Sequence, residues 1–507
     1  MPLFAAACAL AALHLSNPDY LLHAGFPLDD AWIHAVYARE LAHTGTLAYN
    51  PGIAATGETA PAWALILAVI HRMAPGVPSV VFMTKTVGFL FHALSAILVA
   101  LALRRGRAEG TWPALVGGTL VAIHPDLLAA SVSGMEVPLA TAVVAGLVVS
   151  VFRGRATGVA LLATVAVAAR PETVVIAIVL PLLFWGRSRA AMGVRLALVA
   201  GVGATVSMGL LAIRNMIVSG LPLPATFYAK AHTSSLFDVR SQVLGWVGEL
   251  GQLPPVGSVA FLLGLVMLSA VVLIRRRADV TARMGAALYL AGAAFCAVSF
   301  ALVPPADPGA FYWQRYVLPA LLPMLAGVAL LAKVAIDHIP GGTRSVASVA
   351  VAACLVAATA WTAPSRFSRF ANDAHNIDDV QVQLGRTLAT AAPSDIAWMV
   401  DAGAARYFGR AFVVDLVGLN TPMLLGPGAQ AFLDLHPPSY LDVFAGWSDV
   451  KDGWPSVTPA RVFQPSTPYT VSASAAMRQH VLVSCDPLLF QGQLRIGPRT
   501  VAFRCAQ

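Results

Sequence analysis

The sequence predicts a polytopic α-helical membrane protein that ends in a soluble α/β domain. Of its 507 residues, 58% are hydrophobic and only 11% are charged, whereas about 25% of the residues of a soluble domain are charged. Long apolar stretches recur up to residue 362, and the composition is mixed after it. The net charge of +8 can indicate nucleic-acid binding, but in so apolar a chain membrane topology explains it better, and no nucleic-acid partner is expected.

Eleven apolar stretches are candidate transmembrane helices, each of which needs about 20 residues. The first is short enough to be a signal peptide instead. The fifth and sixth are separated only by Arg170-Pro171-Glu172, which predicts a bent pair. The stretches are 3–15, 80–103, 112–130, 134–152, 156–169, 172–185, 193–213, 258–274, 283–303, 315–334 and 345–362.

Basic residues concentrate in alternate loops, which sets the expected orientation. With the N-terminus inside, the outer loops before residue 363 are more acidic than basic, and the positive-inside rule places the C-terminus outside. The bias toward Ala, Gly and Arg suggests a bacterial chain, so we expect a bacterial plasma (inner) membrane with the C-terminal domain on the periplasmic side. The inner loops hold Arg104, Arg105, Arg107, Arg153, Arg155, Arg187, Arg189, Arg195, Arg275, Arg276, Arg277, Arg283, Lys333 and Arg344.

Residues 363–507 are predicted to form the extracytoplasmic α/β domain, with 1–362 as the membrane domain. Its length is sufficient for a core of its own. Apolar runs at 396–400, 412–414 and 481–483 indicate strands, and a helix is expected over 378–391. An oxidising compartment makes a disulfide between two cysteines of this domain plausible, and the other three cysteines are expected in helix cores. The pair is Cys485 and Cys505, and the others are Cys8, Cys296 and Cys354.

The first outer loop, residues 16–79, contains two expected short helices. Trp32, Val36 and Leu41 have helical spacing and precede Gly45, a residue suited to the position after a helix. The pattern predicts an amphipathic helix on the membrane surface. A second helix is expected over 61–73, opened by Pro61 and anchored by Trp63.

Asp29 and Asp30 stand at the start of the first of these helices. A carboxylate there can cap the helix, because it satisfies backbone N–H groups that have no partner within the helix. Adjacent residues do not share a helix face. One aspartate can therefore cap the helix while the other faces a substrate.

A series of motifs, each weak alone, occurs in an order that resembles a known family. The family is that of bacterial GT-C fold glycosyltransferases, polytopic enzymes that use polyprenyl-phosphate sugars. The most similar group includes the mycobacterial terminal arabinofuranosyltransferase, and more distant relatives are protein O-mannosyltransferases and the aminoarabinose transferase of lipid A. The motifs are Asp29-Asp30-Ala-Trp-Ile-His34 through Leu41, Gly45, Tyr49-Asn-Pro-Gly52, Gly57-Glu-Thr59 through Trp63, Gly134-Met-Glu136, Arg170-Pro-Glu172, Pro224-Ala-Thr-Phe-Tyr228-Ala-Lys230, Arg315-Tyr316, Pro319, Asp401-Ala-Gly403, Tyr407-Phe408 and Asp415 through Leu419.

The resemblance implies an inverting transfer of a sugar to a hydroxyl of a cell-envelope glycan, lipid or protein. Asp29 is the expected base, because a carboxylate within reach can take the proton of the acceptor hydroxyl. Asp30 is the second choice or its orienting partner. Further residues expected to line the substrate cavity are His34, Tyr37, Glu58, Glu136, Tyr228 and Tyr316.

The leaving lipid phosphate needs cationic donors, and four residues are candidates: Lys230, Arg315, Arg170 and His232. Each has a simpler alternative. Lys230 can be a loop charge or an interfacial anchor, and Arg315 can be an anchor at a helix end. Arg170 can simply pair with Glu172.

Other polar residues are less specific. Lys85, His92 and His124 lie in apolar stretches, where charge is costly, and a single histidine there is more often structural. Asp401 and Asp415 can shape an acceptor groove or stabilise turns at strand ends. No acidic or histidine cluster has metal-ligand spacing, so no metal or other cofactor is expected.

Two other functions stay open at this point. A flippase for a lipid-linked intermediate predicts acids and bases paired between helices at mid-membrane, whereas the acidic residues here concentrate in outer loops. A non-catalytic scaffold would tolerate changes at Asp29. The expected partners are a polyprenyl-phosphate sugar, the envelope acceptor and membrane lipid.

Overall fold

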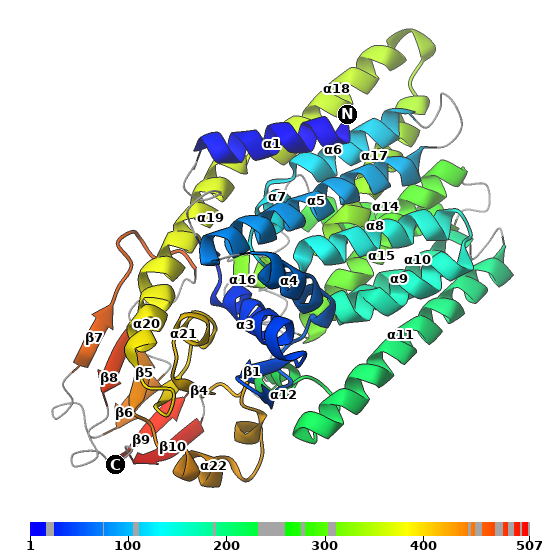
Figure 1. Cartoon of the computed structure of the whole chain (residues 1–507). Coiled ribbons are helices and arrows are strands. Elements are labelled where there is room, and N and C mark those ends of the chain that lie inside the picture. Colours follow the sequence, from blue (N-terminus) through cyan, green and yellow to red (C-terminus); the bar gives the residue numbers. More distant parts are fainter. Residues whose placement is uncertain are drawn as a thin grey trace. The chain divides into compact units, whose positions relative to one another are not determined.

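The computed structural model divides into two compact units, which are described here one at a time (Figure 1). Unit 1 comprises Met1–Leu21, Lys85–Gly209 and Asp238–Ser368, and unit 2 comprises Leu22–Thr84, Leu210–Phe237 and Arg369–Gln507. The structure describes residues 1–16, 25–74, 76–104, 111–185, 189–231, 259–274, 279–302, 311–444, 448–451, 459–471, 480–484, 491–496 and 499–504.

Unit 1 is helical, and each of the eleven predicted stretches contains a helix. Helices α5 and α11 continue from one unit into the other, as does α19 (Ala363–Ile377). The helices are α1 (Pro2–Ser16), α5 (Val77–Leu103), α6 (Thr111–Ile123), α7 (Pro125–Ser131), α8 (Val137–Phe152), α9 (Ala156–Ala169), the 3-10 turn η1 (Pro171–Thr173), α10 (Val174–Trp185), α11 (Ala190–Ser219), α14 (Val259–Ile274), α15 (Val280–Leu302), α16 (Phe311–Gln314), α17 (Leu318–Asp337) and α18 (Gly341–Ala360).

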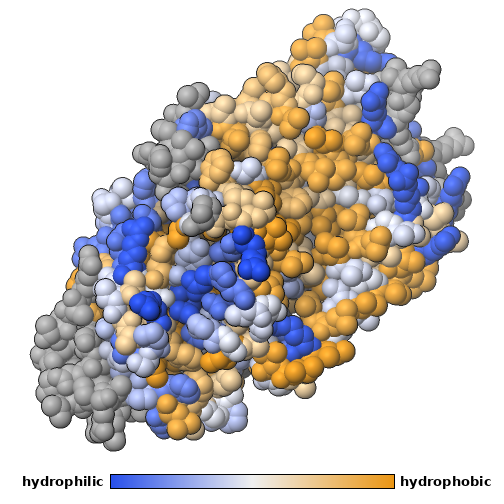
Figure 2. Space-filling model, viewed as in Figure 1, coloured by the Kyte–Doolittle hydropathy of each residue, from blue (hydrophilic) through white to orange (hydrophobic). Residues whose placement is uncertain are grey.

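The length and hydropathy of these helices make the chain a multi-pass membrane protein. Within the described residues, five helices are long and apolar enough to cross a membrane, or six if a bent pair counts as one span. The remaining apolar helices are shorter. On the face seen in Figure 2, hydrophobic residues predominate over the helices of unit 1, and hydrophilic residues gather at the edge of the bundle. Exposed side chains on α11 such as Leu198 and Val202 are suited to contact with lipid.

Close approach of α15 and α17 forms the core of unit 1. A Cβ on Gly327 would lie 2.8 Å from the carbonyl oxygen of Gly285, so only glycine fits at this crossing. Small residues at such crossings let the backbones of membrane helices pack tightly. As a result α17 is buried along most of its length.

Three sequence expectations for unit 1 need correction. The stretch 112–130 is not one straight helix, because α6 and α7 meet at a 58° bend, where Pro125 cannot continue the hydrogen-bond ladder of α6. Arg315 lies between α16 and α17 rather than at the start of a long helix.

The third correction concerns the cysteines. Cys296 is buried as expected, but Cys8 and Cys354 are exposed on their helices. Cys485 and Cys505 lie outside the described residues.

Unit 2 joins the first loop to the C-terminal part of the chain. The division of the chain by contacts therefore differs from the predicted boundary at 362, since the loop packs with residues after 368. From the loop come α3 (Asp29–Thr44), β1 (Ala48–Asn50), β2 (Ile53–Ala54) and α4 (Pro61–Met73), and α12 (Ala225–Ala231) belongs to the same unit.

The C-terminal part of unit 2 is an α/β arrangement, as predicted. A five-stranded sheet has the order β4-β3-β5-β8-β7, parallel among β4, β3 and β5 and antiparallel beyond, and a three-stranded sheet has the order β10-β9-β6. The elements are η2 (Asp378–Val382), α20 (Gln383–Thr387), η3 (Leu388–Thr390), β3 (Ile396–Met399), α21 (Gly403–Phe408), β4 (Phe412–Asp415), η4 (Pro422–Leu425), α22 (Ala429–Leu435), β5 (Tyr440–Phe444), β6 (Ser448–Lys451), β7 (Pro459–Phe463), β8 (His480–Ser484), β9 (Gln491–Ile496) and β10 (Arg499–Arg504).

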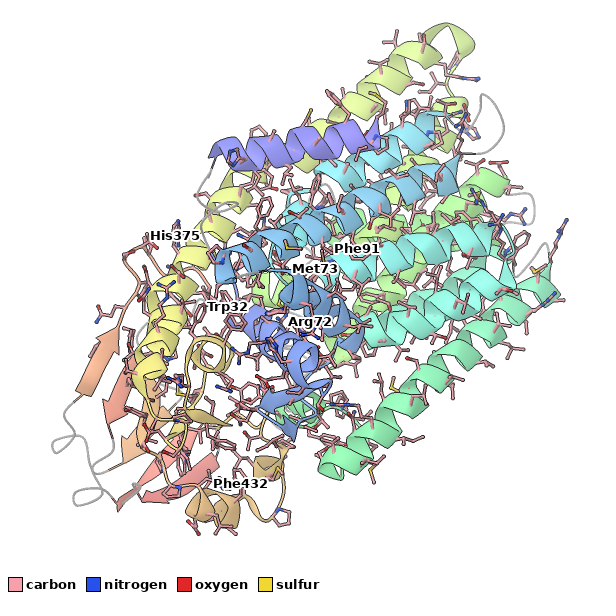
Figure 3. The ribbon with its side chains drawn as sticks, viewed as in Figure 1. Trp32, Arg72, Met73, Phe91, His375 and Phe432 are labelled. Carbon is pink, nitrogen blue, oxygen red and sulfur yellow. The ribbon has the colours of Figure 1, made fainter. Side chains whose placement is uncertain are left out.

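Helix α3 is buried within the protein rather than amphipathic. The prediction of its bounds is confirmed, with Gly45 in the left-handed conformation at φ 73°, but buried residues occur on all its faces. It packs against α4, β1 and α21. Trp32, which is labelled in Figure 3, contacts the rings of Tyr407 and Phe408. The prediction of an amphipathic helix is therefore wrong, because the spacing of apolar residues does not reveal that polar residues such as His34 and Glu40 are also buried. Its position at the membrane surface stays a prediction.

Candidate functional site

Asp29 is bound to the start of a different helix rather than capping its own. The residue before α3, Leu28, holds the cap position, and α3 has no side-chain cap. The two carboxylate oxygens of Asp29 instead accept from the backbone N–H groups of Gly403 at 2.6 Å and Ala404 at 2.8 Å. These are the first two residues of α21, whose N–H groups have no acceptor inside the helix. The prediction that Asp29 caps its own helix is therefore wrong, and Asp29 caps α21 instead.

The environment of Asp29 makes its carboxyl group unusually basic. Burial and the nearby negative charge of Asp401 raise its pKa to about 8, although the N–H groups of Gly403 and Ala404 oppose the change. The residue as a whole has partial solvent exposure, as does its neighbour Asp30, but the carboxyl group itself is buried. A carboxyl that is fixed in orientation and whose pKa is raised toward neutrality has properties of a general base.

Close approach at this point requires Gly403. A Cβ on Gly403 would lie 2.1 Å from the backbone oxygen of Asp29 and 2.8 Å from its Oδ2. Even a methyl group would therefore push α3 and α21 apart. This steric constraint explains why the third residue of the Asp401-Ala-Gly403 motif is glycine.

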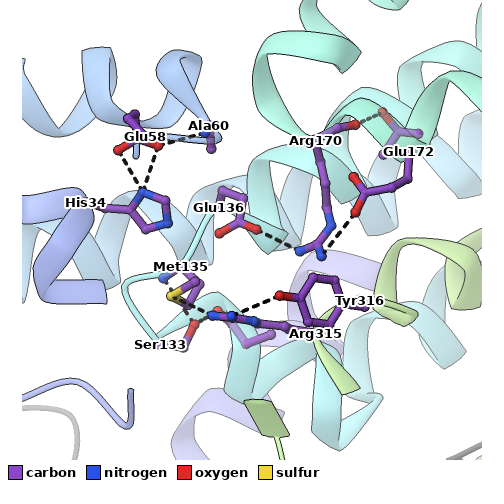
Figure 4. Close-up of polar contacts among 12 residues, drawn as sticks. His34, Glu58, Ala60, Ser133, Met135, Glu136, Arg170, Glu172, Arg315 and Tyr316 are labelled. Atoms are coloured by element: carbon purple, nitrogen blue, oxygen red, sulfur yellow. Dashed lines mark hydrogen bonds and ion pairs between the residues drawn. The ribbon is translucent and has the colours of Figure 1, made fainter. Parts of the chain in front are cut away.

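Two predicted cavity residues, His34 and Glu58, bind each other. The Nδ1 atom of His34 lies 3.0 Å and 2.9 Å from the two carboxylate oxygens of Glu58 (Figure 4). Glu58 also accepts from the backbone N–H of Ala60 at the start of α4, at 2.7 Å. All of this is buried. The pair therefore fixes the loop before α4 against α3.

Tyr37 connects the loop before α4 to the turn that follows strand β4. Its hydroxyl donates to Oδ1 of Asn420 at 3.0 Å and accepts from the N–H of Gly57 at 3.0 Å. Asn420 in turn donates from its backbone and its side chain to Oδ2 of Asp415, each at 2.8 Å. Asp415 therefore stabilises the turn after β4, which is one of the two roles that the sequence suggested for it. Burial raises the pKa of this carboxyl to about 6.

Helix α12 is also attached to this loop. The N–H of Ala225 donates to the oxygen of Thr56 at 3.2 Å, and the hydroxyl of Thr226 donates to the oxygen of Gly57 at 3.0 Å. The motif that contains Tyr228 therefore meets the one that contains Glu58, and Tyr228 is half-buried. Only the backbone of Lys230 is described, in α12, and His232 lies outside the described residues.

Within unit 1 the predicted residues Arg170 and Glu136 form a buried ion pair. Nη1 of Arg170 lies 2.7 Å from Oε1 of Glu136, and Nη2 lies 3.6 Å from Glu172, the partner expected from the sequence (Figure 4). The guanidinium group also lies 4.7 Å from the ring centre of Tyr316. Arg170 is therefore balanced by two carboxylates, which makes it a weaker candidate for phosphate than its charge suggests.

Arg315 is buried beside two tyrosine rings. Its guanidinium carbon lies 4.3 Å from the ring centre of Tyr312 and 5.1 Å from that of Tyr316. It donates to the hydroxyl of Tyr316 at 3.2 Å and contacts the sulfur of Met135 at 3.8 Å. Only 3% of the residue is exposed. An anchor reaching for the membrane interface would be more exposed, so the structure favours a role in the interior.

The polar groups inside the apolar helices are buried. His92 lies 3.0 Å from the oxygen of Ala122, which agrees with a structural histidine. His124 lies 4.0 Å from the buried Asp126 at the bend between α6 and α7. Lys85 is buried near the start of α5. Among the residues that the structure describes, no three His, Cys, Asp or Glu side chains gather as they would around a metal ion.

Sequence reasoning did not find the residues around Asp401. Its Oδ2 accepts from Nε2 of Gln381 at 2.8 Å and lies 3.3 Å from Nε2 of His480. His480 in turn contacts Asp442 at 2.8 Å through Nδ1. A histidine next to the predicted strand 481–483 was the available signal, but nothing in the sequence connects it to Asp401 in the loop after β3.

Replacing Gly403 with alanine tests the contact with Asp29. The added methyl group is expected to lower the unfolding free energy by about 1–3 kcal/mol, as overpacking does. The measurement is thermal unfolding in detergent. Gly426→Ala is the matched control, because a Cβ at Gly426 meets nothing within 4 Å. Equal melting temperatures for both variants would contradict the geometry at Gly403.

Comparison with solved structures shows the fold. ArnT from Cupriavidus metallidurans, bound to undecaprenyl phosphate or in the apo state, is similar with TM-scores of 0.51 and 0.52 and identities of 15% and 16%; each match covers 95% of this chain and 97% of that one. The oligosaccharyltransferase of Archaeoglobus fulgidus in the apo form gives 0.54 and 12%, covering 87% and 69%.

Comparison of sequences is less informative. A family described as a domain of unknown function (DUF8728) matches residues 375–475, and no curated protein matches the chain. Nothing in the comparisons places the chain in the arabinofuranosyltransferase group. The structural likeness, over almost the whole chain, shows that this protein has the GT-C fold.

Proposed function

We propose that the protein is an inverting glycosyltransferase that moves a sugar from a polyprenyl phosphate to a hydroxyl group of a cell-envelope glycan, lipid or protein. The observation that carries the proposal is the Asp29 carboxyl, fixed by two N–H groups and raised in pKa to about 8. The GT-C fold supports the reaction class. The undecaprenyl phosphate bound to ArnT supports the donor class.

In the proposed step, Asp29 accepts the proton of the acceptor hydroxyl while the oxygen attacks the anomeric carbon. The new carbon–oxygen bond forms as the bond to the lipid phosphate breaks, and the electron pair leaves with the phosphate. One displacement inverts the anomeric configuration. The N–H groups of Gly403 and Ala404 orient the carboxylate, and each oxygen keeps a further lone pair for the incoming proton. Asp30 is the second candidate for the base.

The leaving phosphate develops negative charge, which a buried cation stabilises more than an exposed one. Arg315 is our principal candidate, because it is buried beside Tyr312 and Tyr316. Arg170 is a secondary one, since Glu136 and Glu172 already offset its charge. Lys230 and His232 stay candidates from the sequence alone. The proposed step uses side chains and needs no metal or other cofactor.

The acceptor and donor sugars are proposed only as classes. A pentose such as arabinofuranose and a hexose such as mannose both suit the mechanism. We place the reaction on the periplasmic face of the bacterial plasma membrane, because the distribution of arginines predicts that side for the C-terminal domain. A flippase is less well supported, because the buried pair Arg170–Glu136 lies at helix ends rather than at mid-helix.

The test is transfer by the purified protein from a panel of polyprenyl-phosphate pentoses and hexoses to envelope acceptors, with nucleotide sugars as the comparison. The expected result is turnover with at least one lipid-linked donor and none with nucleotide sugars. The product is expected to have the opposite anomeric configuration to the donor, as read by nuclear magnetic resonance. Retention of configuration, or use of nucleotide sugars alone, would overturn the proposal.

A further inference from the structure

His480 is a buried histidine placed between two carboxylates. It lies on β8, is fully buried, and contacts Asp442 on the adjacent strand β5 at 2.8 Å through Nδ1. Its Nε2 lies 3.3 Å from Asp401. Burial alone lowers the pKa of His480, but the charges of Asp442 and Asp401 outweigh it and raise the pKa to about 10. The two carboxylates therefore favour the charged form of the imidazole.

Asp401 connects this cation to the proposed base. It follows β3 and precedes by two residues the Gly403 N–H that binds Asp29. Gln381 holds it from η2, at 2.8 Å. Asp401 and the N–H groups that orient Asp29 therefore belong to one short segment, whose position the contacts of Asp401 help to fix.

The charge of Asp401 also acts on Asp29 directly. It is the main charged neighbour that raises the pKa of Asp29, with Asp30 a smaller contributor on α3 itself. Tyr49 is a further titratable group nearby, on β1, and its hydroxyl donates to the oxygen of Ala402. A positive charge on His480, 3.3 Å from Asp401, has the opposite sign and would offset part of this effect.

We propose that His480 and Asp401 are positioning residues: the ion pair between them fixes the start of α21 and tunes the charge of the Asp29 carboxyl. The inference rests on the proposed role of Asp29 as the base. It assigns to the C-terminal domain a role in the reaction step itself, in addition to any contact with the acceptor. A pair that only stabilised the domain would leave the titration of Asp29 unchanged.

The test compares two substitutions with opposite electrostatic effects. Asp401→Asn removes the negative charge near Asp29, so Asp29 is expected to lose its proton at lower pH. His480→Gln removes the compensating cation, so Asp29 is expected to lose its proton at higher pH. Each shift is expected to be about one pH unit, the lower end of the range for a nearby charge. His436→Gln, a half-buried histidine of the same domain that contacts the oxygen of Phe432 at 2.8 Å, is the control and is expected to cause no shift.

Two readouts separate this proposal from the proposed function. The first is the pH dependence of kcat/KM. The second is the infrared band of the protonated Asp29 carboxyl, assigned by its loss in Asp29→Asn, which requires no turnover. Opposite shifts in the infrared titration support the proposal even if no sugar donor is accepted.

Shifts in the same direction, or no shift, in variants that fold would overturn the proposal. If His480→Gln does not fold, the test is whether Asp29 loses its proton at lower pH in Asp401→Asn. If neither variant folds, the test is the titration of Asp29 in the wild type. An Asp29 that titrates at the ordinary aspartate value would then refute the tuning.

Discussion

Replacing Asp29 with asparagine is expected to lower the rate of sugar transfer about 10²–10⁴-fold, the contribution of a positioned general base. Asparagine keeps one oxygen for an α21 N–H but presents an NH₂ group to the other, so it loses one of the two hydrogen bonds. Above pH 8, where Asp29 is ionised, the substitution also removes a desolvated charge, which offsets that loss. The melting temperature is therefore expected to stay close to that of the wild type. Initial rates with a lipid-linked donor provide the measurement.

Asp30→Asn is the matched control for this substitution. It removes a carboxylate of the same size one residue away, in the first turn of the same helix. We expect a smaller loss of rate than for Asp29→Asn. A larger loss in Asp30→Asn, with both variants folded, would transfer the role of base to Asp30.

Replacing Arg315 with glutamine is expected to lower kcat about 10²–10³-fold, which corresponds to the loss of one donor to the developing charge. Arg315→Lys is expected to recover only part of the rate, because lysine retains the charge but not the forked donor geometry. The measurement is kcat and KM for the lipid-linked donor. An effect on kcat distinguishes stabilisation of the leaving group from simple donor binding.

Arg344→Gln is the control for Arg315. Arg344 lies exposed at the start of α18 and binds backbone oxygens of Asp337 and Ile339. Its substitution is expected to leave both constants unchanged. Equal losses in the two variants would indicate that the change at Arg315 is not specific to the phosphate.

The elements were largely predictable from the sequence, because each depends on local pattern. The apolar stretches, the helices of the first loop and strands β3, β4 and β8 all follow from hydrophobic period and flanking residues. One error has a local cause, because Pro125 bends the third stretch. The other does not, because α3 is buried on all faces by its packing against α4, β1 and α21, which the pattern of α3 itself does not record.

The arrangement around Asp29 could not be predicted in the same way. Its contact with Gly403 joins residues 374 positions apart, and a single sequence contains no record of such pairs. The resemblance to a family placed Asp29 and Gly403 in separate motifs without connecting them. His480 was missed because its partners lie on another strand and in another loop.

The most direct test of the role of Asp29 is kcat/KM for the lipid-linked donor as a function of pH, in the wild type and in Asp29→Asn. The base acts only when deprotonated, and the pKa of Asp29 is raised to about 8. The wild-type value is therefore expected to fall about tenfold for each pH unit below 8 and to level off above it. The variant is expected to be slow and to lack this dependence. A variant that keeps the wild-type rate, or the same dependence on pH, would contradict the assignment of Asp29 as the base.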